Sequence, residues 1–134
     1  MKHHTLLFTV LFAFALLLQA SAQETRLLRE PAISARHIAF VYAGDIWLAD
    51  RDGKNTRRLT THSGTEGAPQ FSPDGAQLAF SGEYDGNYDV FVVSVDGGEP
   101  KRLTWHPQPD IVKGWTPDGQ SVVFASGREN APYS

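Results

Sequence analysis

The sequence predicts an all-β fold built from a repeated unit, and three pairs of matching segments carry the prediction. The first pair is SPDG, which begins at residue 72, and TPDG, which begins at 116. The second is DIWLAD at 45 and DVFVVS at 89, and the third is RRLT at 57 and KRLT at 101. Within every pair the two first residues stand 44 positions apart. A fixed spacing of this size, shared by three independent landmarks, indicates a repeat architecture.

Each unit holds short β-rich runs separated by turn residues, and no amphipathic helix is predicted after Ala22. Four short strands in about 40 to 45 residues are typical of one blade of a β-propeller. The repeats are expected at about residues 31–67, 68–112 and 113–134, the last one truncated. Because a ring needs about 4 to 8 blades, residues 23–134 are expected to form an incomplete β-propeller of about two and a half four-stranded blades.

The N-terminal segment, residues 1–22, is predicted to be a signal peptide. Lys2 gives a positive start, Leu6–Leu18 is an apolar run, and Ala20–Ala22 is a small-residue cleavage motif. The run is shorter than the ~20 residues that cross a bilayer. We therefore expect cleavage after Ala22 and a periplasmic or secreted mature chain; the alternatives are an uncleaved anchor or a buried helix.

The amino-acid composition excludes several kinds of site and partner. The 134 residues include no cysteine, so disulfides and thiolate metal sites are excluded. The formal net charge of −3 gives no basic footprint for nucleic acid. We expect no nucleic-acid partner, no cofactor, no bound metal and no membrane association after signal cleavage.

Gln23–Glu30 precedes the first repeat and is expected to be a short strand or a lead-in, and Pro31 breaks any helix there. Residues 38–42 and 46–49 are β-rich and predict two strands. Asp52-Gly53 is expected to form a type I′ turn between strands. This repeat lacks the Pro-Asp-Gly turn of the others, as a terminal repeat can.

The second repeat is the complete one. Ser72–Gly75 predicts a tight turn with proline at its second position and glycine at its fourth. Residues 78–81 and 90–95 predict strands on either side of a polar loop. The third repeat runs from Trp115, in the place of Phe71, to a strand at residues 122–125.

Four longer stretches carry a resemblance to a known family. They are AFVYAGDIWLAD, RRLTTHSGTEGAPQFSPDG, FSGEYDGNYDV and GGEPKRLTWHPQPDIVKGWTPDG. The general pattern resembles the WD40-like repeats of TolB, of prolyl oligopeptidase relatives and of tricorn proteases. Taken together, from Leu27 to about Arg128, the stretches look like the start of the first propeller of a tricorn-type protease.

This resemblance implies a large serine peptidase that cleaves short peptides, with two propellers, a PDZ domain flanked by catalytic segments, and a homo-hexameric assembly. The family's catalytic serine and histidine lie in its C-terminal half, so no catalytic residue is assigned here and the enzyme status of this chain stays open. Two alternatives remain: a TolB-like periplasmic propeller that binds protein partners, and the propeller lid of a prolyl-oligopeptidase-like enzyme. A G-x-S-x-G motif in an α/β-hydrolase domain would indicate the latter.

Histidines and serines are the candidate catalytic side chains. His62 and His106 are 44 residues apart, and either face a channel as ligands or cap the loop that follows a blade strand, which we favour. Residues at equivalent repeat positions lie in successive blades and do not converge as a triad does. Ser81 and Ser126 precede glycine outside a G-x-S-x-G motif, and are expected to be strand-end serines.

Residues Asp85–Asp89 imitate the opening of a calcium loop. The loop needs glycine at its sixth position, where this chain has Val90, so calcium is not expected. Asp45 and Asp89 each precede a strand and are expected to bond nearby backbone groups.

Tryptophans and arginines complete the candidates. Trp47 and Trp115 align with phenylalanines of the other repeats and are expected in the core between blades, whereas Trp105 has no such equivalent. Arg58 and Arg102 recur before Leu-Thr. They either line a channel that attracts peptide carboxylates or bridge to an acidic turn of a neighbouring blade.

Overall fold

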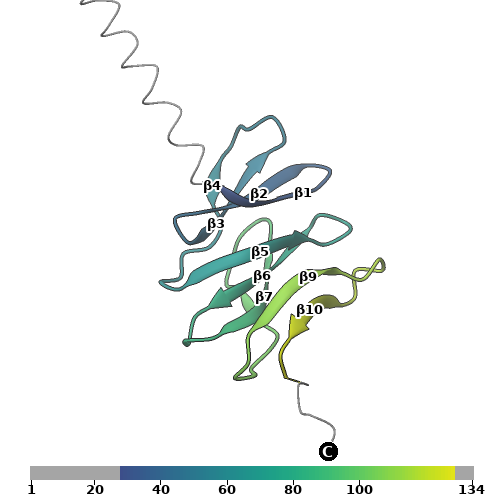
Figure 1. Ribbon diagram of the computed structural model, residues 1–134. Coiled ribbons are helices and arrows are strands. Elements are labelled where there is room, and N and C mark those ends of the chain that lie inside the picture. The colour runs from purple at the N-terminus through teal and green to yellow at the C-terminus, as the bar shows by residue number, and fades with distance from the viewer. Residues whose placement is uncertain (1–27, 129–134) are drawn as a thin grey trace, which may run out of the picture.

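The computed structural model describes residues 28–128, which form three separate antiparallel sheets (Figure 1). In each sheet the strands lie side by side in chain order. Blade 1 holds β1 (Arg29–Ile33), β2 (His37–Tyr42), β3 (Asp45–Asp50) and β4 (Arg57–Arg58). Blade 2 holds β5 (Thr65–Phe71), β6 (Gln77–Glu83), β7 (Tyr88–Ser94) and β8 (Lys101–Arg102), and blade 3 holds β9 (Asp110–Trp115) and β10 (Val122–Ser126).

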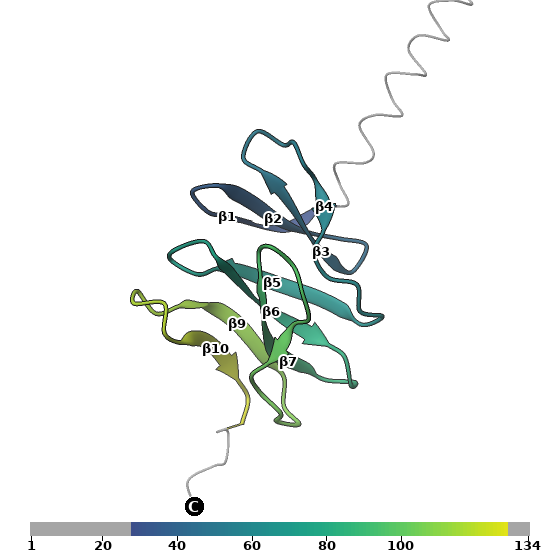
Figure 2. The ribbon, with the colours of Figure 1, turned by 180° about the vertical axis from the view of Figure 1, so that it is seen from behind.

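The three sheets follow one another as layers, and both views show blade 2 between the other two (Figures 1 and 2). The first strands of the blades gather together, because β5 contacts both β1 and β9. β2 and β6 belong to different sheets, as the prediction of successive blades requires. The expected all-β fold of open, incomplete propeller type is confirmed.

The blades begin slightly earlier than the sequence repeats suggested. β5 starts at Thr65 and β9 at Asp110, each three residues before the expected repeat starts at 68 and 113. The first three residues of β5, Thr65-Glu66-Gly67, lack the apolar pattern of a buried strand. Pro31 lies within β1, an edge strand whose register shifts between Arg29 and Ala32, which is where a sheet tolerates proline.

Apolar side chains fill both spaces between the blades. Between blades 1 and 2 the buried residues are Ala39, Ile46, Leu48, Leu59, Leu78, Phe80, Phe91, Val93 and Val95. Between blades 2 and 3 they are Ala79, Val90 and Val112, with Val92, Trp115, Val122 and Phe124 packed against them. Strand alternation sends successive residues to opposite faces, so β6 and β7 of blade 2 each serve both cores.

The type I′ turn lies at Ala43-Gly44, where φ is 53° and 87°, and not at Asp52-Gly53. Only the second residue of the latter pair has a positive φ, 83°. There the Gly53 amide donates to the Asp50 carbonyl at 2.8 Å and the Asp50 amide to the Lys54 carbonyl at 2.9 Å. This is a three-residue loop with glycine in the left-handed region, a second common way to close a hairpin.

The proline turn of the second repeat is confirmed, since the Gly75 amide donates to the Ser72 carbonyl at 2.8 Å. The hydroxyl oxygen of Ser72 accepts from the Gln77 amide at 3.0 Å. In blade 1, Ser34 takes the same place and accepts from the His37 amide at 2.9 Å. A serine therefore closes the hairpin in each of the two blades, although the loop in blade 1 is two residues shorter.

Within residues 28–128 no helix could span a membrane. The predicted signal peptide, residues 1–22, lies outside the described residues.

Candidate functional site at the blade junctions

An ion pair recurs within blades 1 and 2. Nη2 of Arg58 lies 2.8 Å from Oδ2 of Asp45, and Nη2 of Arg102 lies 2.5 Å from Oδ2 of Asp89. Each pair joins the last strand of a blade to the start of its third strand. The aspartates therefore bind a guanidinium, and the expectation that they bond nearby backbone groups is wrong. The arginines bridge within their own blade, not to a neighbouring one.

The threonine that ends each Arg-Leu-Thr motif extends the pair. Oγ1 of Thr60 accepts from the Ile46 amide at 3.0 Å, and Oγ1 of Thr104 accepts from the Val90 amide at 2.9 Å. Nε of Arg58 and of Arg102 donates to the carbonyl of the same threonine, at 3.0 and 2.8 Å. The hydrogen bonds and the ion pair of the repeated motif thus hold the short outer strand of each blade against its sheet.

At each junction, where one blade packs on the next, the following blade contributes a carboxyl group. Glu66, near the start of β5, is buried beneath blade 1. Its Oε2 accepts from the Ile46 amide at 3.1 Å and from the Thr60 hydroxyl, and its Oε1 accepts from the Tyr84 hydroxyl. Burial raises the pKa of Glu66 above its ordinary value, against the opposing effect of these bonds. Burial also raises the pKa of Tyr84, which stays protonated as a donor.

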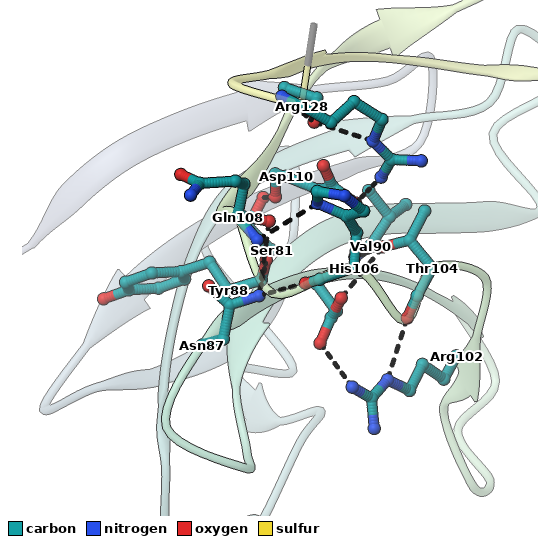
Figure 3. A network of polar contacts seen from close by, with 12 residues as sticks. Ser81, Asn87, Tyr88, Val90, Arg102, Thr104, His106, Gln108, Asp110 and Arg128 are labelled. Atoms are coloured by element: carbon teal, nitrogen blue, oxygen red, sulfur yellow. Dashed lines mark hydrogen bonds and ion pairs between the residues drawn. The ribbon is translucent and has the colours of Figure 1, made fainter. Parts of the chain in front are cut away.

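Asp110 occupies the equivalent position, 44 residues later, at the junction of blades 2 and 3. It is fully buried and pairs with the guanidinium of Arg128 (Figure 3). Burial alone would raise the pKa of Asp110, but the Ser126 hydroxyl, Arg128 and the Thr104 hydroxyl outweigh burial and hold its pKa below the ordinary value. A carboxyl–hydroxyl pair at the first junction therefore corresponds to an ion pair at the second.

Ser81 joins blades 2 and 3. Its buried hydroxyl donates to the Asp110 carbonyl at 3.2 Å and accepts from the Val112 amide at 2.9 Å (Figure 3). It lies inside β6, so its interpretation as a strand-end serine is wrong. Ser126 does end β10, and accepts from the backbone amide and Nε of Arg128. Both hydroxyls serve structural bonds, and neither is held against a histidine as an activated nucleophile requires.

The two histidines take the capping role that we favoured. Nδ1 of His62 accepts from the Gly64 amide at 3.0 Å, and Nδ1 of His106 accepts from the Gln108 amide at 3.1 Å. The ring of His62 also stacks on Tyr84, with centroids 3.7 Å apart. Each histidine thus shapes the connection between one blade and the next.

The loop that imitates a calcium site is organised around an arginine. Asp85 and Asp89 both bind Arg102. The Asn87 amide group donates to the His106 carbonyl at 2.6 Å (Figure 3). A guanidinium thus takes the carboxylates that an ion would need. Within residues 28–128 no group of three or more histidine, aspartate or glutamate residues is placed to hold a metal.

The three tryptophans have three different environments. Trp115 packs between blades 2 and 3 and donates from Nε1 to the Gln70 carbonyl at 3.0 Å, as expected for a core residue. Trp47 instead lies on the outer face of blade 1, edge-on to Tyr42 in an apolar hollow. No described sheet covers that face, so its placement between two blades is not found. Trp105 is 69% exposed, with the Arg102 guanidinium 5.8 Å from its ring.

Sequence reasoning missed the junction residues Glu66, Asp110, Tyr84 and Arg128. The signal that could have found them was the same 44-residue spacing, which relates Glu66 to Asp110 and Tyr84 to Arg128. Chemically, the assembled site is a set of internal bonds between blades. Its carboxyl, hydroxyl and guanidinium groups are directed at one another, and they fix the geometry of a ring wall.

Successive four-stranded sheets, gathered first strands and repeated junction bonds define the class: the described residues are blades of a β-propeller. Residues 25–134 match the family described as the tricorn protease N-terminal β-propeller domain. Because that match covers most of the sequence, the chain belongs to this family.

Individual relatives point to two kinds of propeller protein. A tricorn protease homologue of Streptomyces coelicolor is 42% identical over 55 residues, and a TolB homologue of Chlorobium luteolum is 37% identical over 59 residues. These matches cover 40% and 44% of this chain, but only 5% and 14% of the relatives. The chain therefore corresponds to a small part of either relative.

Solved structures show the same two similarities. TolB from Acinetobacter baumannii has a TM-score of 0.65 at 28% identity, covering 78% of this chain and 28% of that one. The tricorn protease has a TM-score of 0.65 at 27% identity, covering 73% of this chain and 10% of that one. The fold is thus shared with both.

Proposed function

We propose that this chain is the opening part of the first propeller of an exported tricorn-like serine peptidase that acts on oligopeptides. The observation that carries the proposal is the continuous family match over residues 25–134, which spans all three blades. In this proposal the propeller controls the passage of peptides to and from an active site elsewhere in the protein. It also supports a homo-oligomer, a hexamer by family resemblance.

The junction bonds support a structural role for these blades. Glu66 binds blade 1 from β5, and Ser81 binds β9 from blade 2, so each blade is held to the next by buried polar bonds as well as apolar packing. Buried polar bonds of this kind favour one arrangement of the groups that they join. A ring wall with fixed blade orientation suits selection of peptides by size and shape.

Activity-based labelling tests the proposal. A longer form of the protein, extended to the length of the tricorn relatives, is treated with a fluorophosphonate probe and then with fluorogenic oligopeptides. We expect one labelled serine and peptide hydrolysis that the probe abolishes, whereas the 134-residue chain shows neither. A longer form that ends after a single ring and takes up no probe would contradict the peptidase assignment.

A TolB-like propeller that binds protein partners without catalysis is the second candidate. The identity to the Chlorobium TolB homologue and the equal TM-scores of the TolB and tricorn structures favour it. The same experiment separates the two candidates, because a TolB-like protein gives a single ring, no labelled serine and no hydrolysis.

Export is part of the proposal and has its own test. N-terminal sequencing of the protein recovered from the periplasm or the medium is expected to start at Gln23, the residue after the predicted cleavage site. Recovery of the chain with residues 1–22 still attached, in the cytoplasmic fraction, would contradict export. We propose that the protein has no nucleic-acid partner and, after signal cleavage, no membrane anchor.

A further inference from the structure

Aspartate is followed directly by glycine at five places in the chain. These pairs begin at residues 52, 74, 85, 96 and 118. In such a pair the backbone nitrogen of the glycine can attack the carboxyl carbon of the aspartate, because glycine has no Cβ atom to obstruct a close approach. The reaction needs a carboxyl group that is free to turn towards the main chain. The surroundings of each pair therefore decide whether it reacts.

Asp74 and Asp118 lie in equivalent turns and are held in the same way. In each, Oδ1 accepts from the hydroxyl group two residues earlier, at 2.6 Å for Asp74 and 2.5 Å for Asp118. The same atom accepts from the backbone amide two residues later, at 3.0 Å in both turns. The hydroxyl and the amide lower the pKa of both carboxyls, which therefore remain ionised. An ionised carboxylate has no hydroxyl group to lose, so both pairs are protected.

Asp85 and Asp52 are held by cationic side chains. Oδ2 of Asp85 lies 2.7 Å from Nη1 of Arg102. Oδ1 of Asp52 accepts from the Lys54 amide at 3.0 Å, and its Oδ2 lies 3.4 Å from Nζ of Lys54. Turning either carboxyl group towards the following glycine would break these contacts.

The Asp96 carboxylate has no such contact. Asp96 is exposed, and no residue between 28 and 128 donates a hydrogen bond to its side chain. Gly97 and Gly98 follow it at φ 99° and 110°, and a Cβ atom added to either glycine would meet nothing within 4 Å. The Gly97 amide donates to the Ser94 carbonyl at 3.0 Å, but the glycine amides of three other pairs make the same kind of bond. The freedom of its carboxyl group thus distinguishes Asp96 from the other four aspartates.

The open position of this turn does not depend on how many strands of blade 3 are described. Asp52-Gly53 is the equivalent turn of blade 1, 44 residues earlier. Blade 2 packs on blade 1 with four strands, and residues 51–58 nevertheless remain exposed. A complete neighbouring blade therefore leaves this turn in contact with solvent.

We propose that Asp96-Gly97 is a site of spontaneous modification, at which aspartate converts to isoaspartate. The Gly97 nitrogen bonds to the side-chain carboxyl carbon of Asp96, and the hydroxyl group of that carboxyl leaves with the amide proton as water. The product is a cyclic imide. Water then opens the ring at one of its two carbonyl carbons, so that one opening restores aspartate and the other gives isoaspartate, whose main chain runs through the side-chain carbons. The reaction needs no other co-reactant.

The modification would reach the contact between blades 1 and 2. Val95, the residue before Asp96, is 8% exposed in the core between these blades. Its carbonyl accepts from the Arg57 guanidinium of blade 1. Isoaspartate adds one methylene group to the main chain at the next residue and shifts this turn relative to Arg57. The modified chain is therefore expected to unfold at a lower urea concentration than the unmodified chain.

Incubation of the 134-residue chain in mildly acidic buffer tests the proposal, with peptide mapping and fragmentation to locate isoaspartate. In the folded chain we expect isoaspartate to form at Asp96 at least about tenfold faster than at any other aspartate that precedes glycine. In concentrated urea, where the protecting contacts are lost, the rates at the five sites are expected to agree within about threefold. Equal rates in the folded chain, or a faster reaction at another of these sites, would overturn the proposal.

Two variants test the cause and the consequence. Thr116→Ala removes one of the two bonds to the Asp118 carboxylate and is expected to speed the reaction at Asp118 at least about threefold, with the rate at Asp96 unchanged. An unchanged rate at Asp118 would overturn protection by hydrogen bonds. Asp96→Glu is expected to form no isoaspartate at residue 96 and to keep its urea midpoint during incubation, whereas the midpoint of the unaltered chain falls. A constant midpoint in the unaltered chain, with isoaspartate present, would overturn the effect on the blade contact.

Discussion

Nη2 of Arg102 lies 2.5 Å from Oδ2 of Asp89, a carboxylate whose side chain is 2% exposed. The equivalent pair of Arg58 and Asp45 is more open, because the Asp45 side chain is 11% exposed and Arg58 is 43% exposed. The ion pair of blade 2 is therefore expected to contribute more to the free energy of unfolding than the ion pair of blade 1.

Replacing the two arginines tests that difference. Arg102→Gln leaves a buried carboxylate without its counter-ion and is expected to lower the free energy of unfolding by about 3 kcal/mol. Arg58→Gln is the matched control and is expected to lower it by about 1 kcal/mol or less. Urea denaturation of both variants measures the values, and equal losses would contradict the burial argument.

The Glu66 carboxyl should make stability depend on pH. Burial raises its pKa above the ordinary 4.5, so the folded chain binds this proton more tightly than the unfolded chain. Stability is then expected to fall as the pH rises from 4.5 through the raised pKa of the folded state. Glu66→Gln, whose side-chain oxygen can still accept from the Ile46 amide and the Thr60 hydroxyl, should remove this dependence.

Asp110 provides the opposite case at the equivalent position. Its pKa is held below the ordinary 3.8, so the stability that it contributes is present above that value and is lost as the pH falls through its folded pKa. Asp110→Asn should therefore lower stability at pH 7, where Glu66→Gln does not. Urea titrations between pH 3 and pH 8 compare the variants, and equal pH profiles would contradict the assignment.

The Ala43-Gly44 turn places a residue with a Cβ atom in the left-handed region, at φ 53°. Ala43→Gly relieves a strain of about 1 kcal/mol, offset in part by the greater freedom of glycine in the unfolded chain. We expect a gain in unfolding free energy of up to about 1 kcal/mol. Gly44→Ala, at φ 87°, is the control and should be destabilising. Thermal melts distinguish the two, and a loss of stability in Ala43→Gly would contradict the type I′ geometry.

Ser81 is expected to matter more than its size suggests. Ser81→Ala removes the acceptor of the buried Val112 amide and should lower the unfolding free energy by about 2 kcal/mol. Ser121→Ala, at an exposed position outside the junction, should change it by no more than about 0.5 kcal/mol. Denaturant curves for the two variants decide whether the hydroxyl of Ser81 links blades 2 and 3.

The repeat spacing was enough to predict the blades, because equivalent residues make equivalent bonds. The core position of Trp115 follows from alignment of the repeats alone. The type I′ turn at Ala43-Gly44 could not be predicted in this way. Turn propensity favours Asp-Gly at a type I′ turn, but the register of β2 on β3 places the turn at Ala43-Gly44.

The polar junctions lay beyond pattern reasoning for a different reason. Glu66 and Asp110 look like loop residues, because a charged side chain is seldom buried without a partner. Their partners, Tyr84 and Arg128, stand 18 residues away in each case and are chemically unlike. Only the packing of one blade on the next brings each pair together.

The central claim is that successive blades pack face to face, and the tryptophan indole protons test it most directly. A nitrogen-15 correlation spectrum of the labelled chain, with each signal assigned through a tryptophan-to-phenylalanine variant, gives the hydrogen-exchange rate of every indole. Trp115 donates across the junction to Gln70 of blade 2, and its proton is expected to exchange far more slowly than that of the exposed Trp105. Similar rapid exchange at Trp115 and Trp105 would show that blade 3 does not pack on blade 2, and would contradict the account.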